Sequence, residues 1–202
     1  MIAAEKTALI LLAAGRSKRF GDVDKLEQLF LHKPLAFHVV TAFEDIPYQT
    51  RFVVKNGTNL DFESRGYRVI HNDAPEIGLS GSVKLGVACA RAEGAEAVLI
   101  ALADMPRVTA AHVYNLLDAA DGLDAVVASS DGVSPCPPAV FGAGQFDALL
   151  ALEGDEGARA MVRGGRHVFA PASELIDIDT PEDLERLRAS FDFIRAAARR
   201  SD

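Results

Sequence analysis

The sequence contains only two cysteines among its 202 residues, and neither belongs to a recognisable cysteine motif. Cys89 and Cys136 are far apart and have no C-x-x-C or paired-histidine spacing, so we expect neither a disulfide framework nor a zinc site. Such sparse use of cysteine is typical of proteins in a reducing compartment. We therefore expect a cytoplasmic protein.

The sequence also lacks an excess of basic residues and any long apolar run. The formal net charge of -8 would repel a nucleic acid backbone, and no basic stripe compensates for it, so we expect no nucleic-acid partner. The first apolar run, from Ala8 to Ala14, is too short to cross a membrane and has no signal-peptide layout, so we expect no membrane association. A small anionic ligand remains compatible with the charge, because a few focused cations and backbone N–H groups suffice to bind it.

Short apolar runs alternate with longer amphipathic stretches along the whole chain. This pattern predicts an α/β fold in which a mostly parallel sheet is covered by helices on both faces, and the length fits a single domain over residues 1–202. The predicted strands are Ala8–Ala13, Arg51–Lys55, Tyr67–His71, Ala97–Leu102, Ala125–Ser129, Pro138–Phe141, Val168–Phe169 and Leu175–Ile178.

Three predicted helices have clear starting signals. Pro34 opens a stretch that runs to Phe43, and Thr109 caps a stretch that runs to Ala120. The third helix begins at Thr180-Pro181 with an aspartate at position 183, which is similar to a capping box. Because ligands of open parallel sheets bind beyond the carboxyl ends of the strands, polar residues just after the strands are the candidates for chemistry.

A glycine-containing loop with several cations follows the first strand. Between Gly15 and Gly21 lie Arg16, Lys18 and Arg19, and Lys25 follows shortly after, which suits a phosphate cradle. The loop is not a Walker A motif, because its two glycines enclose five residues and are followed by aspartate. It is not a dinucleotide fingerprint either, since serine replaces the second glycine, which argues against a nicotinamide-dependent oxidoreductase. A solvated basic turn is the structural alternative.

Carboxylates follow two other predicted strands. Asp104 comes at the end of the most apolar strand, where it can hold a magnesium ion or simply cap a turn before Pro106. Asp177 and Asp179 are two residues apart, and strand alternation would place both on one face. Either of these two could join a metal site.

The stretch Leu11–Gly21, followed by Lys25 and then Lys33-Pro34-Leu35, resembles the signature of the MobA/MocA-like nucleotidyltransferases. This resemblance implies a Rossmann-like nucleotidyltransferase fold whose loop wraps the triphosphate of a nucleotide. It implies that Leu12, Ala13, Ala14 and Gly15 lie along the nucleotide. It also implies that Arg16 and Lys25 are the charge-bearing catalytic residues.

Four further segments extend the resemblance over nearly the whole chain. Asp104-Met105-Pro106 is similar to the metal-binding motif of the family, and Asp177–Leu184 is similar to its C-terminal motif. The resemblance implies that Asp104 and Asp179 hold Mg²⁺, with Asp177 as the alternative to Asp179. It also implies that Asp104 is catalytic. Two segments, Gly78–Ser82 and Gly154–Arg159, imply further contacts: Ser80 and Ser82 with the base and ribose, and Asp155 and Arg159 with the acceptor.

The double alanine of the loop is closer to the molybdenum cofactor cytidylyltransferase branch of this family than to the guanylyltransferase branch. The resemblance therefore implies that CMP is transferred from CTP to a phosphorylated acceptor, molybdopterin, with release of pyrophosphate, and that a molybdoenzyme could be the client. The segment Gly132–Pro138 departs from the glycine-containing family pattern. This departure keeps a sugar or polyol phosphate open as the acceptor. A module that binds a nucleotide or delivers a cofactor without catalysis is the alternative of another class, although Asp104 and Lys25 are both retained.

Overall fold

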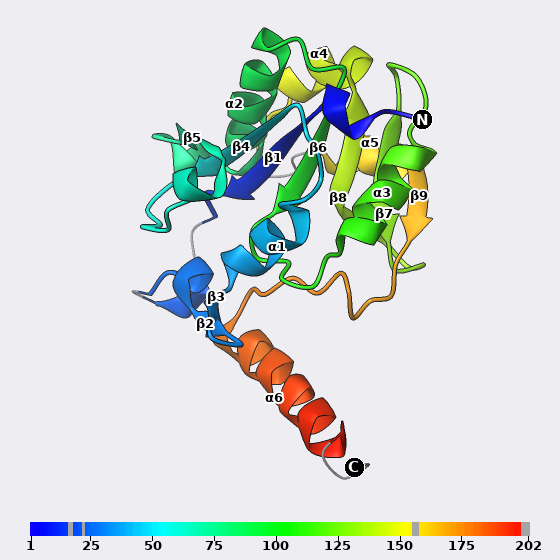
Figure 1. The fold of residues 1–202 in the computed structure, drawn as a ribbon. Helices are drawn as coiled ribbons and strands as arrows, with labels where there is room; N and C mark the ends of the chain where they lie inside the picture. The colour runs from blue at the N-terminus through cyan, green and yellow to red at the C-terminus, as the bar shows by residue number, and fades with distance from the viewer. Residues whose placement is uncertain (16–17, 22, 155–157, 199–202) are drawn as a thin grey trace.

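A seven-stranded sheet forms the middle layer of the structure, a computed structural model that describes residues 1–15, 18–21, 23–154 and 158–198 (Figure 1). The strand order is β5-β4-β1-β6-β8-β7-β9. Within this sheet only β8 runs antiparallel to its neighbours, so the predicted mostly parallel α/β sheet is confirmed. The strands are β1 (Thr7–Ala13), β4 (Thr50–Lys55), β5 (Arg68–His71), β6 (Ala97–Leu102), β7 (Val126–Ser130), β8 (Pro135–Gly142) and β9 (Arg166–Phe169).

Helices cover both faces of the sheet, and the alternation of side chains along the strands explains why. In β1, Leu9 and Leu11 pack with helices α1 (Ala36–Phe43) and α3 (Ala110–Ala119) on one face. Ile10 and Leu12 pack on the other face with helices α2 (Leu79–Ala92), α4 (Phe146–Leu150) and α5 (Arg159–Gly164). Every residue of β1 is buried, as expected for a central strand that is apolar on both sides.

One predicted strand is wrong. Residues Leu175–Ile178 form no strand, because this segment crosses the carboxyl end of β6 instead of joining the sheet. Its backbone is tied there through a hydrogen bond of 3.1 Å from the Ile178 amide to the Asp104 carbonyl. Leu175 and Ile178 are nevertheless buried, in two different hydrophobic clusters, which accounts for the strand-like apolar pattern.

The predicted start of the helix at Pro34 is also wrong by two residues. Lys33–Pro34 (β3) pairs with Leu29–Phe30 (β2) in a small antiparallel ribbon, and α1 begins only at Ala36. The turn of this ribbon places Leu31 and His32 at φ values of 46° and 66°. A left-handed conformation is uncommon for leucine, and the turn contains no glycine or asparagine that would have indicated it.

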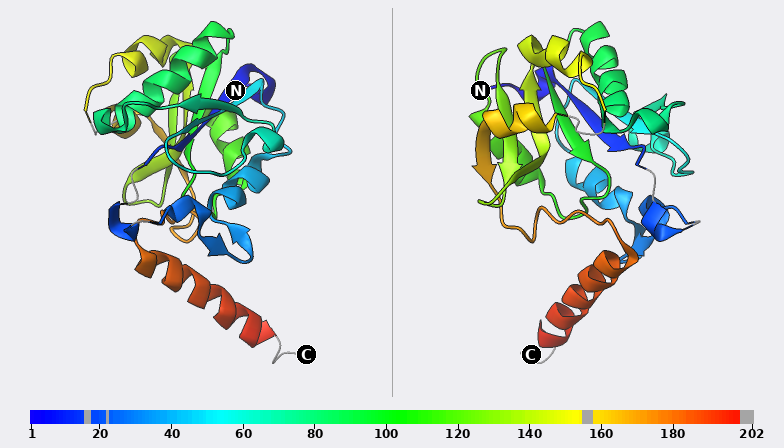
Figure 2. Two further views of the ribbon diagram at one scale, coloured as in Figure 1. Left: turned by 90° about the vertical axis from the view of Figure 1, so that its left-hand side faces the viewer. Right: turned by 180° about the vertical axis from the view of Figure 1, so that it is seen from behind.

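The C-terminal helix α6 (Pro181–Ala198) starts with the predicted capping box. The Thr180 hydroxyl accepts a hydrogen bond from the Asp183 amide at 3.1 Å, and the Asp183 carboxylate accepts one from the Thr180 amide at 2.8 Å. Leu184 and Leu187 anchor the first turns against Phe30. The rest of the helix extends away from the sheet layers in every view (Figures 1 and 2).

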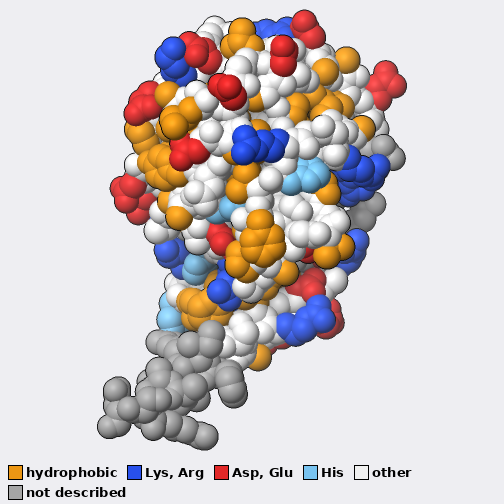
Figure 3. Space-filling model, turned by 90° about the vertical axis from the view of Figure 1, so that its right-hand side faces the viewer, with side chains coloured by type: hydrophobic (Ala, Val, Ile, Leu, Met, Phe, Trp, Pro, Cys, Tyr) orange, Lys and Arg blue, Asp and Glu red, His pale blue; other side chains and the backbone are white. Residues whose placement is uncertain are grey.

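The surface beside the edge strand β9 carries hydrophobic, acidic and basic side chains scattered among one another (Figure 3). It therefore offers no extended field of one sign. Within the described part of the chain, no helix has the length and apolarity needed to span a membrane.

Gly86 lies where helix α2 packs against strand β1. A Cβ added at Gly86 would overlap Cγ2 of Ile10, which is fully buried and has no room to move. We expect Gly86→Ala to lower the free energy of unfolding by about 1–3 kcal/mol, because overpacking outweighs the ~1 kcal/mol that alanine gains in a helix. Urea denaturation measures the change. Gly164→Ala in α5, where an added Cβ meets nothing within 4 Å, is the control and should not destabilise the protein.

Candidate functional site

The carboxyl ends of β1 and β6 bring the glycine loop and Asp104 to the same edge of the sheet. The two strands are parallel neighbours, and beyond them the Ala103 amide donates a hydrogen bond of 3.0 Å to the Leu12 carbonyl. The segment that leads into α6 then crosses this edge at Ile178. Three stretches that are far apart in the sequence thus meet at one place.

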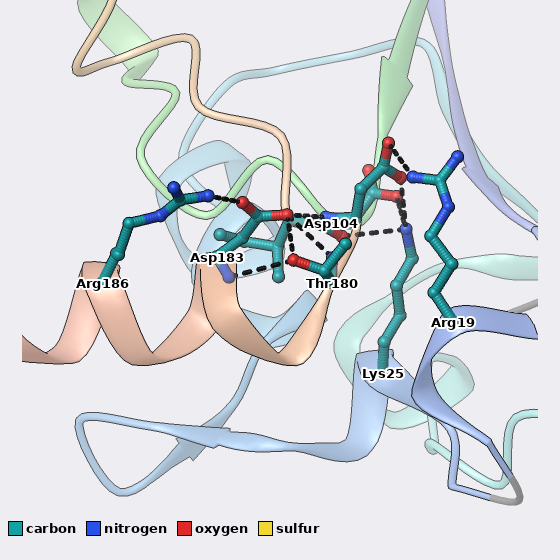
Figure 4. A network of polar contacts seen from close by, with 8 residues as sticks. Arg19, Lys25, Asp104, Thr180, Asp183 and Arg186 are labelled. Atoms are coloured by element: carbon teal, nitrogen blue, oxygen red, sulfur yellow. Dashed lines mark hydrogen bonds and ion pairs between the residues drawn. The ribbon is translucent and has the colours of Figure 1, made fainter.

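Lys25 lies at the centre of this edge and is buried, with 8% of its surface exposed. It begins the short 3-10 helix η3 (Lys25–Glu27), whose N-cap Asp24 accepts a hydrogen bond from the Leu26 amide. Its ammonium Nζ is 2.5 Å from Asp104 Oδ2 and 3.5 Å from Asp179 Oδ1, and it donates a hydrogen bond of 2.9 Å to the Ile178 carbonyl (Figure 4).

Asp179 is held from two sides. The Arg19 guanidinium forms an ion pair of 3.0 Å with its Oδ2, and its amide donates a hydrogen bond of 3.2 Å to the Asp183 carboxylate (Figure 4). The capping box of α6 therefore also fixes the backbone beside the carboxylate cluster. Thr180 and Asp183 have a structural role that explains them without any catalytic one.

Burial and charge perturb the ionisable groups of this cluster. Burial alone would lower the pKa of Lys25, but the Asp104 carboxylate, together with Asp177 and Asp179, raises that pKa above its ordinary value. Although Asp177 is exposed as a residue, partial removal of its carboxyl from water and the charge of Asp104 raise its pKa to about 7. The Oδ1 atom of Asp104 is buried, and no donor of the described residues forms a hydrogen bond with it.

Two neighbouring cavities open at this edge. The first, of about 600 Å³, contains the carboxylate cluster, and its lining residues are Leu12, Ala14, Gly15, Lys25, Pro75, Glu76, Gly78, Leu79, Ser82, Leu102, Asp104 and Asp179. The second, of about 450 Å³, shares Leu12, Leu79 and Leu102 with the first. Its walls are mostly apolar, and the charged residues among the described ones that line it are Arg159, Arg163 and Asp177.

The structure brings most of the sequence-predicted site residues to these cavities. The first cavity receives seven of them, Leu12, Ala14, Gly15, Lys25, Ser82, Asp104 and Asp179. Arg159 and the alternative ligand Asp177 line the second cavity. Ala13 packs in the core under the sheet edge, and Arg16 and Asp155 lie outside the described residues.

Ser80 and Ser82 differ in their surroundings, although both were candidates for contacts with base and ribose. Neither caps α2, whose N-cap is Gly78. Ser80 is fully buried, lines neither cavity, and its hydroxyl has no hydrogen-bond partner in the described part of the chain. Ser82 lines the first cavity and accepts a hydrogen bond of 2.9 Å from the Asn72 side chain.

Sequence reasoning missed Arg163 and the apolar character of the second cavity. Arg163 lies one helical turn after Arg159 in α5, and this i, i+4 spacing was a usable signal. The apolar walls come from Val83, Phe141 and Val162 on three different elements, so no local pattern indicated them.

The carboxylates do not form a complete metal cage by themselves. Among the described residues, no group of three or more His, Cys, Asp or Glu side chains is placed to hold a metal ion. One or two carboxylates at a cavity are nevertheless the protein ligands that Mg²⁺ takes when substrate phosphates supply the others.

Comparisons with known proteins show which family the chain resembles. Residues 9–170 match the model of the MobA-like NTP transferase domain. The chain is 34% identical over 136 residues to the purine catabolism protein PucB of Bacillus subtilis (strain 168), covering 64% of this chain and just under two thirds, 65%, of that protein. It is 31% identical over 186 residues to the molybdenum cofactor guanylyltransferase of Cereibacter sphaeroides, covering 88% and 93%.

A solved structure shares the whole architecture. The homologue of Mycobacterium tuberculosis Rv0371c from Mycobacterium sp. strain JC1 superposes with a TM-score of 0.78 at 25% sequence identity. The similarity covers 94% of this chain and 98% of that one, so the Rossmann-like fold extends over almost all of both.

The raised pKa of Asp177 predicts a pH-dependent stability. A carboxyl whose pKa is higher in the folded than in the unfolded protein stabilises the fold at low pH and loses this contribution as pH rises through the folded value. We expect the free energy of unfolding of the wild type to fall, relative to Asp177→Asn, between about pH 4 and about pH 8. Urea denaturation of both proteins across this pH range, in buffer that contains a metal chelator, measures the difference in the free energy of unfolding. A difference between the two proteins that stays constant over this pH range would contradict the assignment.

Proposed function

The chain belongs to the MobA-like NTP transferase family, and on this basis we propose that it transfers CMP from CTP to a phosphorylated acceptor, molybdopterin, and releases pyrophosphate. The observation that carries the proposal is the meeting of Gly15, Lys25 and Asp104 in one cavity at the carboxyl ends of parallel strands. A cation for phosphate oxygens and a carboxylate for a metal ion are thereby adjacent.

The residues present fit a divalent metal ion. Asp104 has one buried oxygen without a hydrogen-bond donor, and its other oxygen already faces a cation, the Lys25 ammonium. We propose Asp104 and Asp179 as the protein ligands of Mg²⁺, since both line the first cavity and Asp177 lines the second. When bound, the ion would neutralise charge on the triphosphate and on the departing pyrophosphate.

The reaction asks the protein for positioning and charge neutralisation. An oxygen of the acceptor phosphate forms a bond to the α-phosphorus of CTP, while the bond from that phosphorus to the bridging oxygen breaks and pyrophosphate leaves. No covalent intermediate with the protein is required. Lys25, with Arg16 from the glycine loop, would hold the departing phosphates, and Ser82 would contact the nucleoside.

The second cavity supports an acceptor with an anionic group on a largely apolar body. Arg159 and Arg163 supply two guanidinium groups, which bind phosphate oxygens in a planar, paired geometry. The apolar walls would leave the hydroxyls of a sugar or polyol phosphate without partners, and each unpaired buried hydroxyl disfavours binding. A planar heterocycle such as a pterin can place its apolar faces against these walls, while its polar edge needs hydrogen bonds from side chains such as Ser134.

Two observations bear on the identity of the nucleotide base. The relative from Cereibacter sphaeroides is named for guanylyl transfer, which supports a molybdenum cofactor precursor as acceptor but would favour GTP. The double alanine at positions 13 and 14 favours CTP.

Four NTPs should therefore be tested against molybdopterin and against sugar phosphates, with released pyrophosphate as the readout. Release from CTP only with molybdopterin supports the proposal; brisk turnover with a sugar phosphate refutes the acceptor, and binding without turnover indicates a non-catalytic module.

Removal of the Asp104 charge should impair catalysis strongly. We expect Asp104→Asn to lower turnover by about 10²-fold or more, because the proposed metal-borne stabilisation of charge is weakened. Pyrophosphate release under saturating nucleotide measures the loss. Asp118→Asn, an exposed aspartate of α3, is the matched control. Unchanged turnover in Asp104→Asn would mean that another residue holds the metal.

Lys25 and a metal ion should compete for the negative charge of the same carboxylates. We expect Lys25→Met to bind Mn²⁺ about tenfold more tightly than the wild type in the absence of nucleotide, because an ammonium no longer neutralises Asp104 and Asp179. The same variant should bind CTP more weakly. Mn²⁺ titration followed by electron paramagnetic resonance measures the first effect. Lys6→Met, which breaks an exposed pair with Glu96, should change neither, and equal Mn²⁺ affinity in Lys25→Met would contradict the competition.

A further inference from the structure

The pairing of β7 with β8 is irregular at the edge of the second cavity. Ala128 pairs with Ala139, but the next residue, Ser129, pairs with Cys136, so that the register shifts at this point. The two residues skipped on β8 are Pro137 and Pro138, which have no N–H to offer a neighbouring strand. Backbone hydrogen bonds to β7 therefore cannot hold Pro137 and Pro138 in place.

Two linked hydrogen bonds between buried side chains replace the missing ladder contacts. The Ser129 hydroxyl, 0% exposed, donates a hydrogen bond of 2.8 Å to the Pro138 carbonyl. His112 Nε2 lies 2.8 Å from the same hydroxyl oxygen, and this histidine is 3% exposed. The chain thus connects α3, β7 and β8 through the interior.

The direction of these hydrogen bonds determines which ring nitrogen of His112 carries a proton. A carbonyl can only accept, so the single proton of the Ser129 hydroxyl is used toward Pro138. The Ser129 oxygen must then accept from His112, which requires a proton on Nε2 of the imidazole. His112 is therefore an obligatory donor in this chain.

The segment held in this way forms a wall of the second cavity. Ser134, Pro135, Cys136 and Pro137 all line that cavity, and Pro138 follows them directly. His112 itself does not line it. Its effect on a ligand must pass through Ser129 and the Pro138 carbonyl.

We propose that His112 is a positioning residue for acceptor specificity, which holds the Ser134–Pro137 wall in place through Ser129. This inference rests on the proposed function in assigning the second cavity to the acceptor. The mechanical part, in which His112 fixes the wall, stands on the hydrogen bonds alone. The two parts are tested by separate readouts.

The first readout is the alkylation of Cys136, which lies in the wall and is half-buried. We expect His112→Met, which cannot donate, to raise the rate of alkylation of Cys136 by iodoacetamide about fivefold relative to Cys89, because the Ser129 hydroxyl is then no longer oriented toward the Pro138 carbonyl and holds the wall less firmly. His112→Gln keeps an N–H donor and should remain within about twofold of the wild type. Mass spectrometry follows both cysteines, and Cys89 in α2 is the internal control.

The second readout is kinetic and uses the same variants. His112→Met should raise the KM for the acceptor about tenfold, since misplacement of a wall weakens positioning, while the Kd for CTP stays unchanged and His112→Gln restores the KM. If His112→Met does not fold, Ser129→Ala breaks the same chain and replaces it. Equal Cys136 alkylation in all variants would overturn the proposal. Faster alkylation with no change in any acceptor KM would overturn only the assignment of the cavity, and no turnover in the wild type would overturn the proposed function.

Discussion

The buried ion pair between Lys25 and Asp104 is the interaction on which the arrangement of the site depends. It joins the residues after β1 to the residue after β6, and the same ammonium binds the carbonyl of Ile178 in the segment before α6. Neither partner is more than 17% exposed at its side chain, so loss of one would leave the other charge poorly solvated. The interaction fixes three separate chain segments at one edge of the sheet, and both cavities are built around that edge.

The fold could be predicted from the sequence because its signals are local. Central strands such as Ala97–Leu102 are short apolar runs, and the Thr180–Asp183 cap is readable from four residues. The small ribbon β2–β3 could not be predicted, because its turn uses left-handed leucine and histidine. Leu175–Ile178 was misread because burial against two clusters gives the same apolar pattern as a strand.

The candidate site was predictable where polar residues follow strands directly, as Asp104 does. The sequence indicated Lys25 and Asp104 separately, and the structure brings their charged atoms into contact. It could not distinguish Asp177 from Asp179, since two carboxylates two residues apart look alike in a pattern. In the structure Asp179 lines the first cavity and Asp177 the second, and both carboxylates help to raise the pKa of Lys25. The pairing of Arg19 with Asp179 spans most of the chain and has no local signal.

The reversed direction of β8 has a chemical consequence for the second cavity. Because β8 is antiparallel to β6, its amino end lies at the edge where the parallel strands present their carboxyl ends. At this end of β8, Pro135, Pro137 and Pro138 have no backbone N–H to offer. This wall therefore presents few backbone donors, and the positive charges that line the same cavity come from α5, at Arg159 and Arg163. For the acceptor proposed above, this asymmetry would set one orientation, with the charged group at the arginines of α5 and the apolar part against the prolines.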